Sequence, residues 1–301
     1  MKSLWTALTA SALALTACAS GQGSLTESGV PTVSGPTVVA AFYPLAYAAG
    51  RIGGDRINVI GLTPPGGEPH DLELSAAQVA QIASADLVLY VKGYQPAVDE
   101  AVAQQAADHS LDVSADLALL PAASAADDSA TDPHVWLNPL NMAAIGSAVA
   151  SRLSTVDPAN TKAFTANDQS LTASMSTLND TYVAGLANCR STQMVVSHEA
   201  FAYLGAAYGL RQVGISGLSP DAEPSPSRIK DVAEIVAREG ISTIYYETLV
   251  DPKVARTLAD ETGAVTAVLD PIEGLMADST QTYETIMAQN LATLRAGQGC
   301  A

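Results

Sequence analysis

Positive charge is scarce in this sequence. Its 301 residues include 14 Lys and Arg side chains against 31 Asp and Glu, which gives a formal net charge of −17. Proteins that bind nucleic acid present a basic patch to the phosphates, and attraction to anionic membrane surfaces also needs Lys and Arg. The balance therefore argues against both kinds of partner. It suits a protein that attracts cations, although an ordinary solvated acidic surface explains it equally well.

Long apolar runs are equally scarce, with one short exception at the start. Lys2 precedes a mostly apolar run at residues 4–15, which is too short to span a membrane permanently. The run ends in Leu15-Thr16-Ala17-Cys18, which resembles the lipobox of bacterial lipoproteins. No later run of about 20 apolar residues follows, so we expect no membrane-spanning helix in the remainder.

In a lipobox the peptide is cut before the cysteine, whose sulfur then carries the lipid. We therefore predict a signal peptide at 1–17, a lipid on Cys18 and a flexible tether at 18–35, which is rich in Gly, Ser and Thr. This places the protein outside the cytoplasm, anchored by lipid to the bacterial cell membrane. An ordinary secretory signal cut near Ala19 is the alternative.

Cysteine is rare as well. Apart from Cys18, the chain contains only Cys189 and Cys300. A pair in an oxidising compartment predicts a disulfide, which would close a loop of about 110 residues and tie the C-terminus down. Two free buried thiols are the alternative. A cysteine-based metal site would need closer spacing than this pair has.

Apolar runs and helix-like spacing alternate through the rest of the chain. The expected strands are 37–43, 57–62, 87–91, 193–196, 211–214, 241–246 and 265–269. The expected helices are 44–53, 76–83 (capped by Ser75), 95–107, 139–153, 158–186, 199–208, 227–239, 252–262 and 281–296. This alternation predicts an α/β protein with two Rossmann-like lobes and parallel sheets, at 36–155 and 189–301, joined by a linking helix at 156–188.

Histidine occurs four times. His70 follows a Pro-Gly turn, His134 follows a proline just before a helix start, and His198 ends an apolar strand. Ligands of open α/β sheets bind at the carboxyl ends of the strands, so the fold could bring these three imidazoles into one cleft. Imidazole suits zinc, copper, iron or nickel. His109 lies at a helix end with no strand before it, and we expect it at the surface.

Four acidic residues flank the three candidate histidines: Asp71, Glu73, Asp132 and Glu199. Carboxylates beside metal-binding histidines commonly orient the imidazole rings through the second ring nitrogen. We consider these four residues as such partners. Ordinary turn and cap residues would give the same pattern.

Five stretches of the sequence recur in a known family in the same order and with the same spacing. They are EPHDLELS (68–75), ADLVLY (85–90), DPHVWLNP (132–139), SHEAFAYL (197–204) and LDPIEGL (269–275). Through these motifs, from about residue 36 to the C-terminus, the chain resembles the metal-binding lipoproteins of bacterial zinc and manganese ABC importers. The resemblance implies two α/β lobes joined by one long rigid helix, with the metal ion held between the lobes.

The resemblance also implies that His70, His134 and His198 bind the metal. For the fourth ligand the resemblance favours Glu273, as in some zinc members; Asp270, as in manganese members, is the alternative, and a water molecule is the third option. In manganese-importing relatives the position of His198 is typically a glutamate, which gives a site richer in oxygen. Three nitrogen ligands favour zinc, so we predict that zinc binds more tightly than manganese.

The function implied is a solute-binding lipoprotein that captures Zn²⁺ and delivers it to an ABC permease, as a monomer and without catalytic turnover. A manganese or iron binder of the same fold, a zinc-dependent hydrolase and a surface adhesin are the alternatives. Against the hydrolase, the sequence has no HExxH motif and no nucleophile elbow. The segment at 121–132 also lacks the histidines that many zinc members carry there, so we expect no metal-gathering role for it.

Overall fold

The computed structural model describes residues 35–123 and 131–301. The predicted signal peptide, the predicted lipidation site Cys18 and all but the last residue of the predicted tether lie outside the described residues, as does most of the segment at 121–132. Val33–Ala301 forms one compact unit. Among the helices of the described part, none is both long enough and apolar enough to cross a membrane.

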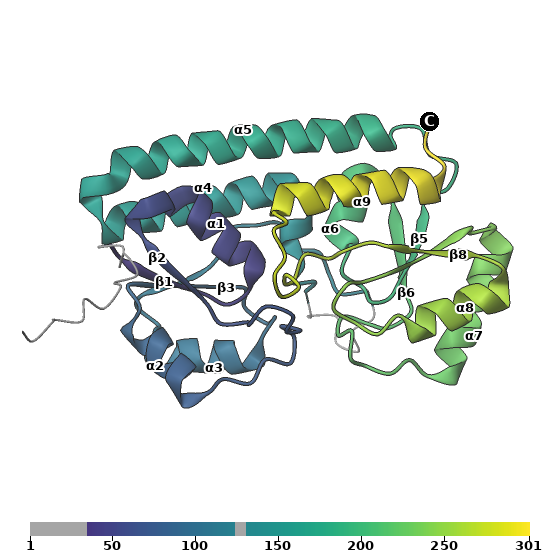
Figure 1. Ribbon diagram of the computed structural model, residues 1–301, viewed down its shortest axis with the longest axis horizontal. Coiled ribbons are helices and arrows are strands. Elements are labelled where there is room, and N and C mark those ends of the chain that lie inside the picture. Colours follow the sequence, from purple (N-terminus) through teal and green to yellow (C-terminus); the bar gives the residue numbers. More distant parts are fainter. Residues whose placement is uncertain (1–34, 124–130) are drawn as a thin grey trace, which may run out of the picture. The chain divides into compact units, whose positions relative to one another are not determined.

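The first lobe is built on a four-stranded parallel sheet with the order β2-β1-β3-β4. Its strands are β1 (Thr37–Ala40), β2 (Asn58–Gly61), β3 (Leu87–Tyr90) and β4 (Ser110–Asp112). Its helices are α1 (Tyr43–Gly53), α2 (Ala76–Ser84), α3 (Pro96–Gln105) and α4 (Pro139–Val156). The central strand β1 is flanked by β2 and β3, with Val39 opposite Ile60 and Val88. Helices α1 and α4 lie on one side of the sheet, and α2 and α3 on the other (Figure 1).

The second lobe repeats this topology with the order β6-β5-β7-β8. Its strands are β5 (Gln193–Val196), β6 (Arg211–Gly214), β7 (Thr243–Tyr246) and β8 (Val265–Val268). Its helices are α6 (Ala202–Tyr208), α7 (Pro226–Glu239), α8 (Lys253–Thr262) and α9 (Tyr283–Gln298). All pairings are again parallel. The α/β prediction with two parallel-sheet lobes is therefore confirmed.

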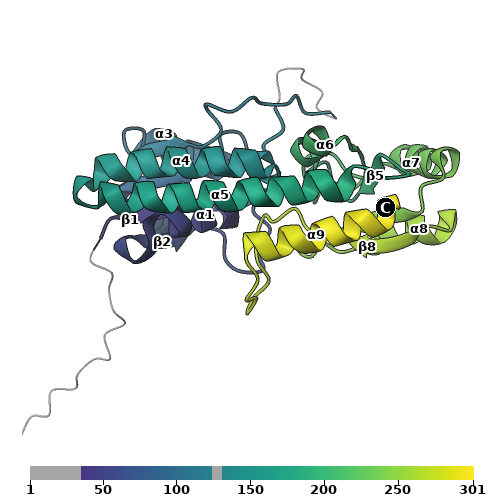
Figure 2. The same ribbon diagram turned by 90° about the horizontal axis from the view of Figure 1, so that it is seen from above.

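One long helix connects the lobes. Helix α5 (Thr161–Leu186) has 26 residues, about 39 Å at 1.5 Å per residue. It packs on α1 and α4 of the first lobe and on α6 and α9 of the second (Figure 2). The side chains that it buries recur seven and four residues apart along one stripe: Phe164, Leu171, Met175, Tyr182 and Leu186. Because this single stripe packs on both lobes, α5 fixes one lobe against the other.

Two local predictions were borne out and one was wrong. Ser75 caps α2 through a capping box with Gln78, and Cys189 and Cys300 form the predicted disulfide. The helix expected from Glu199 begins only at Ala202. The residues before it make other contacts: the His198 carbonyl accepts the Ala200 N–H at 3.0 Å in a tight turn, and the Phe201 N–H donates to Gln212 Oε1 at 2.7 Å.

Candidate metal centre

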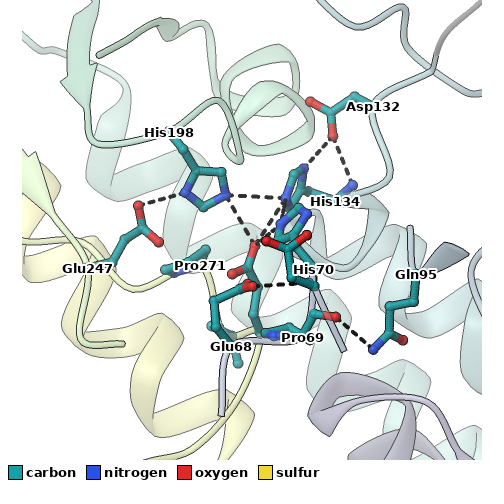
Figure 3. A network of polar contacts seen from close by, with 12 residues as sticks. Glu68, Pro69, His70, Gln95, Asp132, His134, His198, Glu247 and Pro271 are labelled. Carbon is teal, nitrogen blue, oxygen red and sulfur yellow. Dashed lines mark hydrogen bonds and ion pairs between the residues drawn. The ribbon is translucent and has the colours of Figure 1, made fainter. Parts of the chain in front are cut away.

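Four side chains from both lobes converge on one point. The donor atoms of His70, His134, His198 and Glu273 all lie within 4.8 Å of one another. Glu273 Oε1 lies 3.3, 3.0 and 3.2 Å from the Nε2 atoms of the three histidines, in that order. His134 Nε2 lies 3.4 Å from the Nε2 atoms of both other histidines (Figure 3). Three nitrogens and one oxygen therefore surround one small volume.

These separations fit a tetrahedral ion. A zinc ion bound at about 2.0–2.1 Å from four donors keeps those donors about 3.3 Å apart. Five of the six donor pairs lie 3.0 to 3.4 Å apart, and the sixth, His70 with His198, lies within 4.8 Å. Most of the donor separations are therefore already close to those that a tetrahedral metal would require.

The fold explains why residues so far apart in sequence meet. His198 follows β5 by two residues, and Glu273 lies in the loop between β8 and α9. His70 lies in the loop between β2 and α2, and His134 directly precedes the 3₁₀ turn at Val135–Leu137. The two sheets thus direct their carboxyl edges toward the same region, as parallel α/β sheets do at their ligand sites.

Two of the imidazoles are oriented by carboxylates on their second nitrogen. Asp132 Oδ1 lies 2.8 Å from His134 Nδ1, and it also accepts the His134 backbone N–H at 2.8 Å. Glu247 Oε1 lies 2.6 Å from His198 Nδ1. Such contacts fix the ring and its tautomer, so Nε2 is left to face the site (Figure 3).

The sequence predictions for these partners were partly right. Asp132 holds its histidine as expected, whereas Asp71, Glu73 and Glu199 form no hydrogen bond to an imidazole among the described residues. Glu247 was missed. It follows β7, the neighbour of β5, in the way His198 follows β5. An acidic residue directly after a buried strand was therefore the available signal.

The charges at the site depend on one another. Burial alone would lower the pKa of His198, but the carboxylates of Glu247 and Glu273 outweigh it and raise that pKa well above its usual value. The pKa of His134 is likewise raised, because Asp132 and Glu273 outweigh its burial. For Glu273, burial opposes ionisation, yet the three histidines hold its pKa well below the usual range. The carboxylate is thus kept ionised among imidazoles.

His70 has a different environment. Burial is the main influence on it and lowers its pKa, despite the nearby Glu273 carboxylate. Its ring packs edge-on against Tyr94, with the ring centroids 4.6 Å apart. Gln95 Nε2 donates to the Pro69 carbonyl at 2.9 Å and holds the loop directly before it. His70 is also the most accessible of the four donors, at 9% exposed, whereas the other three are at most 2% exposed.

An aromatic wall closes the first-lobe side of the site. Trp136 is fully buried, and its ring centroid lies 5.2 Å from that of His134 and 5.3 Å from that of Tyr94. Phe42 packs against Tyr94 and Trp136 behind it. This apolar wall limits the access of water to the donors and strengthens the electrostatic interactions between them.

Asp270 lies in the same loop as Glu273 but outside the donor group. Its Oδ2 accepts the Thr248 hydroxyl at 2.8 Å, and its Oδ1 accepts the Ile272 backbone N–H at 2.7 Å. Ile272 has a φ of 59°, a left-handed conformation that a β-branched residue rarely adopts and that costs about 1–3 kcal/mol. The backbone reversal at Ile272 separates the directions of the two carboxylates.

His109 lies apart from the donor group, as predicted. It sits between α3 and β4, where its Nδ1 contacts Asp108 at 2.7 Å and its Nε2 contacts the Ile82 carbonyl at 3.3 Å. Its side chain is 24% exposed. It therefore serves as a histidine control for the site.

Two parallel α/β lobes, one long helix and a buried group of three imidazoles and a carboxylate define a two-lobed protein with a preformed site for a metal ion. The family model described as "ZnuA: Zinc-uptake complex component A periplasmic" matches residues 38–297. The chain belongs to this family.

Individual relatives with similar sequences are consistent with this family. The chain is 32% identical over 275 residues to the zinc-binding lipoprotein AdcA of Streptococcus pneumoniae (strain ATCC BAA-255 / R6), a match that covers 86% of this chain and 55% of that protein. It is 31% identical over 277 residues to the high-affinity zinc uptake system protein ZnuA of Bacillus subtilis (strain 168), which covers 86% of each. The chain thus spans about half the length of the AdcA relatives that it matches.

Solved structures are similar over most of the chain. Zn(II)-bound AdcA from S. pneumoniae superposes with a TM-score of 0.77 at 32% identity, covering 88% of this chain and 58% of that one. The laminin-binding protein Lmb of Streptococcus agalactiae, described as having adhesin and metal transporting activity, gives a TM-score of 0.80 at 29% identity and covers 88% and 99%.

Proposed function

We propose that this protein binds Zn²⁺ outside the cytoplasm and delivers it to an ABC-type permease, as a solute-binding protein without catalytic turnover. The observation that carries the proposal is the buried convergence of His70, His134, His198 and Glu273, whose donor atoms all lie within 4.8 Å of one another. Zinc is the transported ion and not a resident cofactor. Zinc-binding and zinc-uptake relatives support the choice of ion, and the permease is the partner that such a protein requires.

We propose Glu273 as the fourth ligand, in preference to Asp270 or water. Its Oε1 contacts all three imidazole nitrogens, whereas both oxygens of Asp270 accept other hydrogen bonds. Three nitrogens and one oxygen favour zinc over manganese, both by ligand type and by the Irving–Williams order. Copper, nickel and cobalt would also suit these donors, so their exclusion depends on geometry or availability.

The remaining features complete the proposal. A lipid on Cys18 would hold the protein at the membrane. The protein would act as a monomer, with lobes at 36–155 and 189–301 and a linker at 156–188. Two or more acyl chains anchor a protein stably, whereas one alone binds marginally. The Cys18→Ala protein is therefore expected in the soluble fraction after a high-salt wash. A variant that stays with the membranes under that wash would contradict lipid anchoring.

Metal analysis of the purified protein, followed by competition titration, tests the proposed function. We expect one zinc per chain and a lower Kd for Zn²⁺ than for Mn²⁺ at neutral pH. The His109→Ala protein is the histidine-matched control and should bind zinc as the wild type does. Manganese binding equal to or tighter than zinc binding would overturn the selectivity. Loss of zinc binding in His109→Ala would overturn the ligand assignment.

A further inference from the structure

We propose that Asp270 is a positioning residue that holds Glu273 against the three histidines. Asp270 stabilises the left-handed backbone at Ile272, and that backbone turns the next side chain, Glu273, into the site. The inference rests on the proposed function, because it concerns the same zinc site. It gives Asp270 a role that differs from that of a ligand.

Asp270 is held at four points. Its carboxylate accepts from Thr248 and from the Ile272 backbone, as described above. Its own backbone is held by one side chain of α9: the Asn290 amide donates to the Asp270 carbonyl at 2.6 Å, and the Asn290 side-chain oxygen accepts the Asp270 N–H at 2.9 Å. The loop after β8 is therefore tied to the second lobe before it reaches the site.

The same loop is tied to the first lobe one residue later. Trp136 Nε1 donates to the Pro271 carbonyl at 2.7 Å, and the Tyr283 hydroxyl donates to the Trp136 carbonyl at 2.6 Å. Pro271 lies beside the site (Figure 3). Ile272 is fully buried, so its side chain cannot turn outward to relax the backbone. With both sides held, the loop presents Glu273 in one direction only.

Without the Asp270 carboxylate, the Ile272 N–H would lose its acceptor, and only the contacts of Asn290 and Trp136 with the neighbouring backbone would oppose relaxation of the unfavourable left-handed conformation. The loop would then relax, and the Glu273 carboxylate would leave its position 3.0–3.3 Å from the three Nε2 atoms. A side-chain amide would preserve much of this arrangement. Its oxygen accepts from Ile272, and its NH₂ donates to the Thr248 oxygen. Positioning thus requires the shape of Asp270 and its hydrogen bonds, whereas coordination would require its charge.

Zinc Kd values of three single variants separate these roles. Asp270→Ala is expected to weaken zinc binding about 10–100-fold, the usual effect of removing a group that orients a metal ligand. Asp270→Asn should stay within a few-fold of the wild type. Asp251→Ala is the matched control, because Asp251 likewise accepts the backbone N–H two residues later, from Lys253 at 3.0 Å, at the start of α8. Its Kd should not change.

Double variants show whether Asp270 acts through Glu273. In a Glu273→Ala background, Asp270→Ala should cause no further loss of zinc affinity. If Asp270→Ala does not fold, judged by its thermal unfolding without metal, Thr248→Val replaces it, since it removes one hydrogen bond to Asp270. The few-fold loss expected for Thr248→Val should also vanish in the Glu273→Ala background.

Three outcomes would overturn the inference. Asp270→Asn could bind zinc as weakly as Asp270→Ala, or Asp270→Ala could bind zinc as tightly as the wild type. Asp270→Ala could also reduce zinc affinity further in the Glu273→Ala background. A wild-type protein that does not bind zinc contradicts the proposed function itself, so the two failures are distinguishable.

Discussion

The two lobes share one topology, but the surroundings of His70 in the first lobe differ from those of His198 in the second. His198 of the second lobe follows a buried strand by two residues, its Nδ1 contacts Glu247, and its pKa is raised. His70 of the first lobe lies in a loop, forms no hydrogen bond through Nδ1 to a described residue, and has a lowered pKa. A repeated fold thus supplies one imidazole that a carboxylate orients through Nδ1 and one without such a partner among the described residues.

The four donors also differ in how they are supported and in how accessible they are. His134 and His198 are oriented by carboxylates, and Glu273 is held in the loop after β8. His70 is the most accessible donor, and it depends on a loop held by Gln95 and by the Gly66–Leu275 backbone hydrogen bond of 2.7 Å. Among the four donors, His70 is therefore the one that depends most on the position of its loop.

The largest effect is expected from removing one histidine at a time. Because partners of a metal ligand contribute about 10–100-fold, loss of the ligand itself should exceed about 100-fold. We expect His198→Ala to weaken zinc binding more than His70→Ala, since Glu247 makes His198 the more basic donor and remains buried without a partner in the variant. Competition titration gives both Kd values, and thermal unfolding without metal gives the stabilities. Equal losses of zinc affinity in His70→Ala and His198→Ala would contradict the expected difference between these two histidines.

The intermediate effect is expected from the carboxylate behind His198. Glu247→Gln keeps an oxygen that accepts from Nδ1–H but removes the charge, so zinc affinity should fall by about tenfold or somewhat more. Glu199→Gln is the matched control: Glu199 is also buried and adjoins His198 in sequence, but it contacts Arg228, at 3.9 Å, and no imidazole. Zinc titration of both variants tests this. A similar loss in Glu199→Gln would indicate a general effect of buried charge.

The sequence was sufficient for the outline of this site. Histidine is rare in the chain, and only His109 lacked a strand or proline turn before it, so composition and spacing together predicted the three imidazoles. Asp132 was predictable because it lies two residues before His134. The strand and helix order followed from apolar periodicity, and the predicted disulfide from the only cysteine pair.

Longer-range contacts determined the remainder. The resemblance favoured Glu273 over Asp270 as the fourth ligand, but the physical reason comes from the structure. The reversal at Ile272 separates the two carboxylates, and Thr248 and Asn290 from elsewhere in the lobe hold Asp270. Glu247 was one acidic residue among 31, and only the adjacency of β5 and β7 brings it to His198. Local pattern therefore predicts which residue types are available, and strand order determines which of them meet.

The smallest effect is expected from pH, and it tests the contrast between the lobes directly. Imidazole must lose its proton to bind zinc, so affinity should fall as the pH decreases. Because the pKa values of His134 and His198 are raised, protons compete with zinc at a pH above the usual value of about 6.5. His70, with its lowered pKa, should be neutral over that range and contribute nothing to the decline.

In Glu247→Gln the pKa of His198 should fall, so the decline of affinity should begin at a lower pH than in the wild type. Zinc Kd values measured across pH 5–8 in about half-unit steps would show this shift. A wild-type curve that coincides with that of Glu247→Gln after scaling would contradict the role assigned to the Glu247 charge.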